Sequence, residues 1–130
     1  MTPEALRALF RAQRAAFAAH YPHVAKARLY IVDRRCPQGT VCAPRDLAWQ
    51  LGDGIHILKR ALRLSRPHLE ALVAHELSHL GDLRRHEPGS EQRADDIAER
   101  VLGRRIRYSR KTLVQTFGPG LYPRPKSLHS

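Results

Sequence analysis

HELSH at residues 75–79 and EQRAD at residues 91–95 are the two stretches from which the organisation of this chain can be derived. Apolar residues surround the first stretch at helical spacing, and Pro67 stands where a helix tolerates proline, so a helix is predicted over residues 67–80. The second stretch opens a helix predicted over residues 91–102. A glycine, the residue that most often ends a helix, follows each of these predicted helices directly.

The first stretch has the HExxH spacing of a metal-binding helix. His75 and His79 are four positions apart, so their imidazoles lie one turn apart on one helix face and can reach the same metal ion. Glu76 projects about 100° round the helix from His75, close enough to reach a metal-bound water without binding the metal. The stretch therefore predicts two metal ligands and a general base.

The second predicted helix supplies carboxylates for such a site. Glu91 and Asp95 share a face with small and apolar residues, and a carboxylate buried there needs a partner. Glu91 can complete a His₂Glu metal site that leaves a fourth position for water. Asp95 can accept a hydrogen bond from the far nitrogen of a ligand imidazole and so fix its tautomer. In the alternative interpretation, Glu91 is a first-turn acid favoured by the helix dipole and Asp95 is a surface residue.

The loop between the two helices offers further candidates for the third ligand, His86 and Asp82. The longer HExxHxxGxxH pattern fails, because it needs glycine at position 82 and histidine or aspartate at position 85, where the chain has Asp82 and Arg85. The remaining histidines are scattered along the sequence and are expected at the surface: His20, His23, His56, His68 and His129.

With HELSH followed by E-x-x-A-D-x-x-A on a second helix, the sequence resembles the gluzincins, the thermolysin-like zinc metallopeptidases. In that group the third zinc ligand is a glutamate on the helix after the HExxH helix, and an aspartate four residues later supports the first histidine. The resemblance implies that His75, His79 and Glu91 bind one Zn²⁺ ion. It also implies that Glu76 is the general base and Asp95 the supporting carboxylate.

The resemblance extends over roughly residues 25–102 and implies an α+β, minimal zincin-like fold. This fold has an N-terminal helix, a small three-stranded sheet, the HExxH helix, the glutamate helix and an extended C-terminal tail. The group's additional electrophile, a tyrosine or a histidine, has no motif in this chain, and His86 and Tyr108 are its candidates. The N-terminal helix is predicted at residues 3–19, and the strands at residues 28–33, 47–51 and 55–58.

The last predicted strand has a functional interpretation of its own. We expect it to form the edge of the sheet beside the cleft, where an extended substrate adds as a further strand. Its residues are Ile55, His56, Ile57 and Leu58.

The charge of the chain is unevenly distributed. The 130 residues include 23 Lys and Arg and 12 Asp and Glu, which gives a net charge of +11. Residues 1–99 carry all 12 acids and only +3 of this charge, whereas residues 100–130 hold eight basic residues and no acid. We therefore expect a zincin-like domain at residues 1–103 and a basic, Pro- and Gly-containing extension at residues 104–130. The extension can bind nucleic acid by releasing counterions, bind an acidic partner, fold over the domain or remain solvated.

The expected compartment is the cytoplasm. No stretch approaches the roughly 20 apolar residues of a membrane span, and the N-terminus lacks the basic region and apolar core of a signal peptide. No membrane partner is expected. Cys36 and Cys42 are expected to be reduced thiols beside a turn, and a disulfide that closes the loop between them is the alternative.

These features together predict a zinc metallopeptidase that acts on a protein or peptide substrate. Zinc would lower the pKa of its water and polarise the scissile carbonyl, while Glu76 would take the water proton and pass it to the leaving amine. The alternative is a zinc-stabilised binding or structural module without catalysis, associated with nucleic acid through its basic tail. The two hypotheses differ in whether the fourth position of the metal is open to water.

Overall fold

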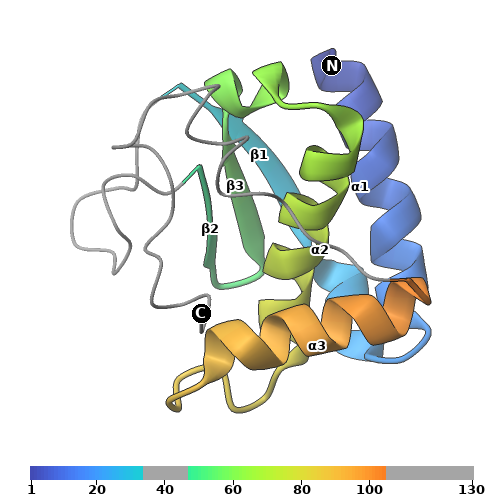
Figure 1. Ribbon diagram of the computed structural model, residues 1–130, viewed down its shortest axis with the longest axis vertical. Helices are drawn as coiled ribbons and strands as arrows, with labels where there is room; N and C mark the ends of the chain where they lie inside the picture. Colours follow the sequence, from blue (N-terminus) through green and yellow to red (C-terminus); the bar gives the residue numbers. More distant parts are fainter. Residues whose placement is uncertain (34–46, 105–130) are drawn as a thin grey trace.

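The computed structural model describes residues 1–33 and 47–104, which fold as three α-helices packed with a small mixed sheet (Figure 1). The described residues confirm the predicted α+β class. None of their helices is long and apolar enough to cross a membrane. In chain order the elements are α1 (Pro3–Ala18), the 3₁₀ helix η1 (Pro22–Lys26), β1 (Arg28–Val32), β2 (Ala48–Leu51), β3 (Gly54–Leu58), the 3₁₀ helix η2 (Lys59–Arg63), α2 (Arg66–Gly81) and α3 (Ser90–Leu102).

Helix α1 packs against α2 through the apolar stripe that its sequence predicts. Thr2 Oγ1 accepts a hydrogen bond from the Ala5 N–H and so caps the first turn, where one of the unpaired amides of the helix needs an acceptor. Leu6 and Phe17 are fully buried near the two ends of the stripe. Between them, the side-chain amide of Gln13 donates to the Glu70 carbonyl oxygen of α2 at 3.0 Å, which gives a buried polar group a partner.

The central strand of the sheet is β3, with β1 parallel on one side and β2 antiparallel on the other. The expectation that Ile55, His56, Ile57 and Leu58 form the sheet edge is therefore wrong. The Gly52-Asp53-Gly54 turn explains the β2–β3 pair, because a short turn joins antiparallel neighbours. The local pattern does not show that β1 pairs with the other side of β3.

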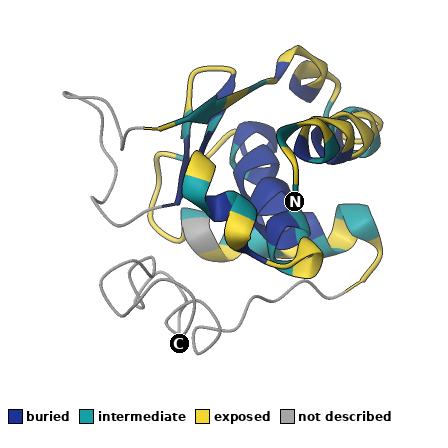
Figure 2. Ribbon diagram, turned by 90° about the horizontal axis from the view of Figure 1, so that it is seen from above, coloured by how far each residue is buried: buried dark blue, intermediate teal, exposed yellow. Residues whose placement is uncertain are grey.

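The two faces of the sheet differ in what covers them. Ile55 and Ile57 alternate with His56 along β3 and are completely buried in the core, in which α2 is the most extensively buried helix (Figure 2). On the opposite face the His56 ring stacks between Tyr30 of β1 and Trp49 of β2, with ring centroids 4.9 and 5.4 Å away. His56 is thus half-buried and belongs to a row of rings across all three strands, which the expectation of a surface histidine did not include.

A short 3₁₀ helix that the sequence pattern did not reveal, η1, packs against the end of α2. His23 Nε2 donates to the Leu80 carbonyl oxygen at 2.7 Å, which satisfies an acceptor left unpaired at the helix C-terminus. Gly81 is the last residue of α2 and does not follow the helix as expected. A Cβ atom at Gly81 would stand 3.2 Å from the Tyr21 ring, so this close approach explains the glycine.

Replacing His56 with Phe should weaken the pH dependence of stability below about pH 6.5. Burial lowers the pKa of folded His56, although a Gly54 backbone hydrogen bond partly raises it. As the pH falls below the usual value of about 6.5, the unfolded chain therefore takes up a proton that the folded protein resists, and the free energy of unfolding decreases. His56→Phe keeps a ring in the stack but cannot titrate.

Urea unfolding at pH 7.5 and pH 5.5 measures this effect as a difference between the two proteins. We expect the wild type to lose more stability on acidification than His56→Phe does. An equal loss in both would contradict a folded-state pKa below the usual value for His56.

Candidate metal centre

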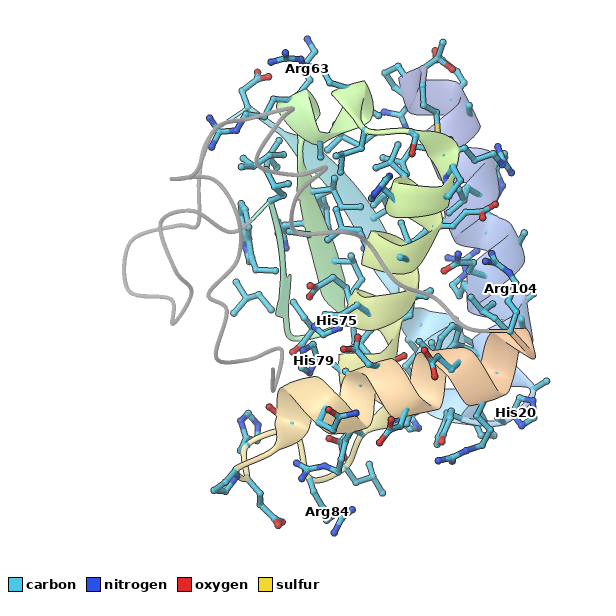
Figure 3. All side chains as sticks on the ribbon, in the orientation of Figure 1. His20, Arg63, His75, His79, Arg84 and Arg104 are labelled. Atoms are coloured by element: carbon cyan, nitrogen blue, oxygen red, sulfur yellow. The ribbon has the colours of Figure 1, made fainter. Side chains whose placement is uncertain are left out.

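Two histidines from α2 converge near the C-terminal end of that helix, beside α3 (Figure 3). His75 Nε2 and His79 Nε2 lie 3.1 Å apart, and the two rings are nearly perpendicular, with centroids 4.7 Å apart. This arrangement follows from the i, i+4 spacing, which stacks the two side chains on one helix face. Both residues belong to an extensively buried helix, so their backbones are held by the core.

Asp95 of α3 binds the other nitrogen of the His75 ring. His75 Nδ1 lies 2.8 Å from Asp95 Oδ1, and the His75 residue is 5% exposed. An ionised carboxylate only accepts hydrogen bonds, so Nδ1 carries the proton and, in the neutral ring, Nε2 carries a lone pair. With Nδ1 bound to Asp95, the lone pair on His75 Nε2 lies on the side of the ring that faces His79.

The spacing of the two Nε2 atoms fits a shared metal ion. Zinc–nitrogen bonds of about 2.0–2.1 Å at a tetrahedral ion place two ligand nitrogens roughly 3.3 Å apart. The observed 3.1 Å is close to this separation. Without a metal, the same distance suits a hydrogen bond in which His79 Nε2–H donates to the lone pair on His75. Conversion from this arrangement to a shared metal ion requires the neutral His79 ring to carry its proton on Nδ1 instead of Nε2, together with small movements of the two rings.

The third proposed ligand, Glu91, stands on α3, one helical turn before Asp95. The two positions share a helix face by their spacing, but the Glu91 side chain lies outside the described part of the structure. Among the side chains that are described, no group of three or more His, Cys, Asp or Glu could hold a metal ion. The described geometry therefore supplies two imidazole nitrogens of a ligand set.

Glu76, the candidate general base, is buried on α2 with 7% of its surface exposed. Burying a carboxylate is costly unless it has a polar or charged partner. The position of Glu76 directly after His75 keeps it on the helix that carries both histidines. The structure thus places a buried acid next to the histidine pair in sequence and on the same rigid element.

Asp82, the alternative third ligand, is engaged elsewhere. Its Oδ2 accepts from Arg93 Nε at 3.0 Å and its Oδ1 accepts from the Arg84 N–H at 2.9 Å. Burial favours the neutral acid and raises the pKa of Asp82, but these two donors more than offset burial and hold that pKa below its usual range. Asp82 is therefore the ionised partner of Arg93, an arrangement that sequence reasoning missed.

The structure describes only some of the remaining candidates. His86, a candidate ligand and electrophile, is exposed in the connection between α2 and α3. Tyr108, the second candidate electrophile, lies outside the described residues, as do Cys36, Cys42 and residues 105–130 of the basic extension. Strand β3 lies inside the sheet and offers no edge for a substrate.

Comparison of the chain with protein-family models, curated proteins and solved structures found no match in any of the three. The assignment of a function therefore depends on the site itself. Its described core is the chain of contacts from Asp95 through His75 to His79.

The tautomer of His75 can be tested directly. In metal-free protein, long-range ¹⁵N–¹H NMR correlations should show His75 protonated at Nδ1, because Asp95 accepts that proton. Asp95→Ala should abolish this preference and shift His75 toward the Nε2–H tautomer. Asp96→Ala, a change at the exposed neighbouring acid, should leave the spectrum of His75 unchanged. An Nε2-protonated His75 in the wild type would contradict the assigned geometry.

Proposed function

We propose that this protein is a zinc metallopeptidase of the gluzincin type that hydrolyses peptide bonds in a protein or peptide substrate. The observation that carries the proposal is the 3.1 Å approach of His75 Nε2 and His79 Nε2, with Asp95 bonded to the far side of His75. A pair of converging imidazoles, of which the buried His75 is oriented by a carboxylate, is typical of a zinc site. The HExxH spacing adds Glu76 as the general base.

In this proposal His75, His79 and Glu91 hold one Zn²⁺ ion. Two neutral imidazoles and one carboxylate suit zinc, which binds nitrogen and oxygen ligands in a four-coordinate arrangement. When bound, zinc lowers the pKa of water toward about 7 and polarises a carbonyl group. Asp95 keeps His75 in the tautomer that leaves Nε2 unprotonated.

Glu76 performs the proton transfers of the proposed reaction. It accepts a proton from the attacking water and later donates that proton to the amine that leaves the cleaved peptide bond. Its burial on α2 limits the exchange of this proton with bulk solvent.

The substrate-binding strand must be reassigned in this proposal, because β3 is internal to the sheet. Strand β2 (Ala48–Leu51) packs against α2 and pairs with β3 through one edge only, so its other edge is open among the described residues. Backbone groups on such an edge can pair with an extended peptide. We therefore assign the substrate edge to β2.

Zinc binding tests the ligand set. The wild type should bind one Zn²⁺ ion per chain in isothermal titration calorimetry. His75→Ala, His79→Ala and Glu91→Gln should each weaken binding by roughly 100-fold or more, because each removes one bond to the ion. Glu87→Gln, which changes an exposed glutamate in the nearby connection, is the matched control and should bind zinc like the wild type. A wild type that binds no zinc would rule out the proposed site.

Catalysis is tested separately with Glu76→Gln. This variant should keep the zinc stoichiometry of the wild type but lose peptide hydrolysis by about 10²–10⁴-fold, because glutamine cannot accept the proton of the attacking water. Mass spectrometry of a diverse peptide library after incubation with zinc-loaded protein measures cleavage. A zinc-loaded wild type that cleaves nothing would favour the non-catalytic zinc module, and an active Glu76→Gln would refute the role of Glu76.

A further inference from the structure

The connection between α2 and α3, residues 82–89, joins the two helices that carry the proposed site. It has almost no hydrophobic core of its own: Asp82 is its one buried residue, and Leu83 is 80% exposed. The connection therefore cannot take its shape from apolar packing. Its shape has to come from hydrogen bonds and ion pairs.

One side chain, Arg93 of α3, supplies most of these bonds. All three guanidinium nitrogens of Arg93 donate hydrogen bonds to the connection. Lysine could not replace these bonds, because its single ammonium group lacks the planar set of N–H donors that arginine has. Arg93 donates from Nε to Asp82 Oδ2 at 3.0 Å, from Nη1 to the Pro88 carbonyl at 2.8 Å, and from Nη2 to the carbonyls of Arg84 at 2.6 Å and Glu87 at 3.3 Å.

The Asp82 end of this network is anchored to α2. The Asp82 N–H donates to the Ser78 carbonyl at 2.9 Å and so continues the hydrogen bonding of the helix. The Asp82 side chain is 5% exposed and that of Arg93 is 21% exposed, so water screens this ion pair much less than a surface pair. The pair links the last turn of α2 to the first turns of α3.

The other end of the network determines where α3 begins. Gly89 has a left-handed backbone with φ +85°, and a Cβ atom there would lie 3.3 Å from Arg93 Nη1. Ser90 is the first residue of the helix, and no side-chain cap bond is made at the N-cap, Gly89. The Arg93 side chain instead binds the carbonyl oxygen of Pro88, the residue directly before the N-cap Gly89.

We propose that Arg93 is a positioning residue that sets the placement of Glu91 and Asp95 relative to the histidine pair. Arg93 lies between these two acids on α3, and its side chain fixes both the start of that helix and its link to α2. It acts through Asp95 and Glu91, not by contact with the metal. The inference builds on the proposed zinc site, but its structural part, the effect on the His75–Asp95 hydrogen bond, applies without metal.

The test compares Arg93→Gln and Arg93→Lys with a matched arginine change. Arg104 Nη2 binds Glu70 Oε1 of α2 at 2.8 Å, at the opposite end of α3 from the histidine pair (Figure 3). Arg104→Gln therefore also breaks an ion pair, between α2 and the residue that follows the C-cap of α3, but far from the proposed site. Circular dichroism and thermal unfolding of the metal-free proteins establish which variants fold.

The first readout is metal binding by folded protein. Competition with a chromophoric chelator should show about 10–100-fold weaker Zn²⁺ binding by Arg93→Gln, the size of effect expected for a residue that orients a ligand. The visible spectrum of Co²⁺-loaded protein should change as well, because it reports the coordination geometry. Arg93→Lys keeps the positive charge but lacks the planar set of guanidinium donors, so its Zn²⁺ binding should remain impaired. Arg104→Gln should bind Zn²⁺ like the wild type. Unchanged affinity and spectrum in a folded Arg93→Gln would overturn the proposal.

The second readout needs no metal and separates this inference from the proposed function. In metal-free Arg93→Gln the NMR signature of Nδ1-protonated His75 should weaken, while Arg104→Gln should retain it. If Arg93→Gln does not fold, Arg93→Lys and Asp82→Asn provide milder changes for both measurements, and wild-type behaviour in both variants would overturn the proposal. If the wild type binds no zinc, the proposed function fails, and the His75 signal alone decides the role of Arg93.

Discussion

The hydrogen bond between His75 Nδ1 and Asp95 Oδ1 is the contact on which the candidate site depends. It joins α2 to α3 through a buried histidine and a carboxylate that is 27% exposed. Its geometry assigns the proton of the His75 ring to Nδ1 and leaves Nε2 with a lone pair that faces His79. The rest of the molecule holds these two helices in place: the core packs around α2, and charged contacts join α2 to α3 near both ends of α3.

The helical part of the fold could be derived from the sequence because helical information is local. The spacing of apolar residues, Pro67 at the start of α2 and Gly103 after α3 predicted both helices to within one residue of the observed bounds. Helical spacing also predicted that His75, His79 and Asp95 could share one site. His75 and His79 are four positions apart on one face of α2, and Asp95 was predicted on the inward face of α3. The structure places His75 in contact with both of the others.

The features that sequence reasoning missed depend on contacts between distant residues. β3 is the central strand because β1 pairs with the edge of β3 that β2 leaves free. No local sequence pattern determines this pairing. His56 looked like a surface residue because its ring partners, Tyr30 and Trp49, lie on other strands. Asp82 looked like a possible metal ligand because its partner Arg93 is 11 positions away on another helix.

The aromatic row on the outer face of the sheet gives the protein an internal optical probe. Trp49 is the single tryptophan of the chain, and it lies on β2 with its ring parallel to that of His56 at 5.4 Å. The helices account for most of the regular structure and thus for most of the far-ultraviolet circular dichroism, whereas tryptophan fluorescence arises from the sheet alone. The two signals therefore follow the two layers of the molecule separately. If a peptide pairs with β2 as proposed above, it lies beside Trp49, and the emission of Trp49 would report its binding.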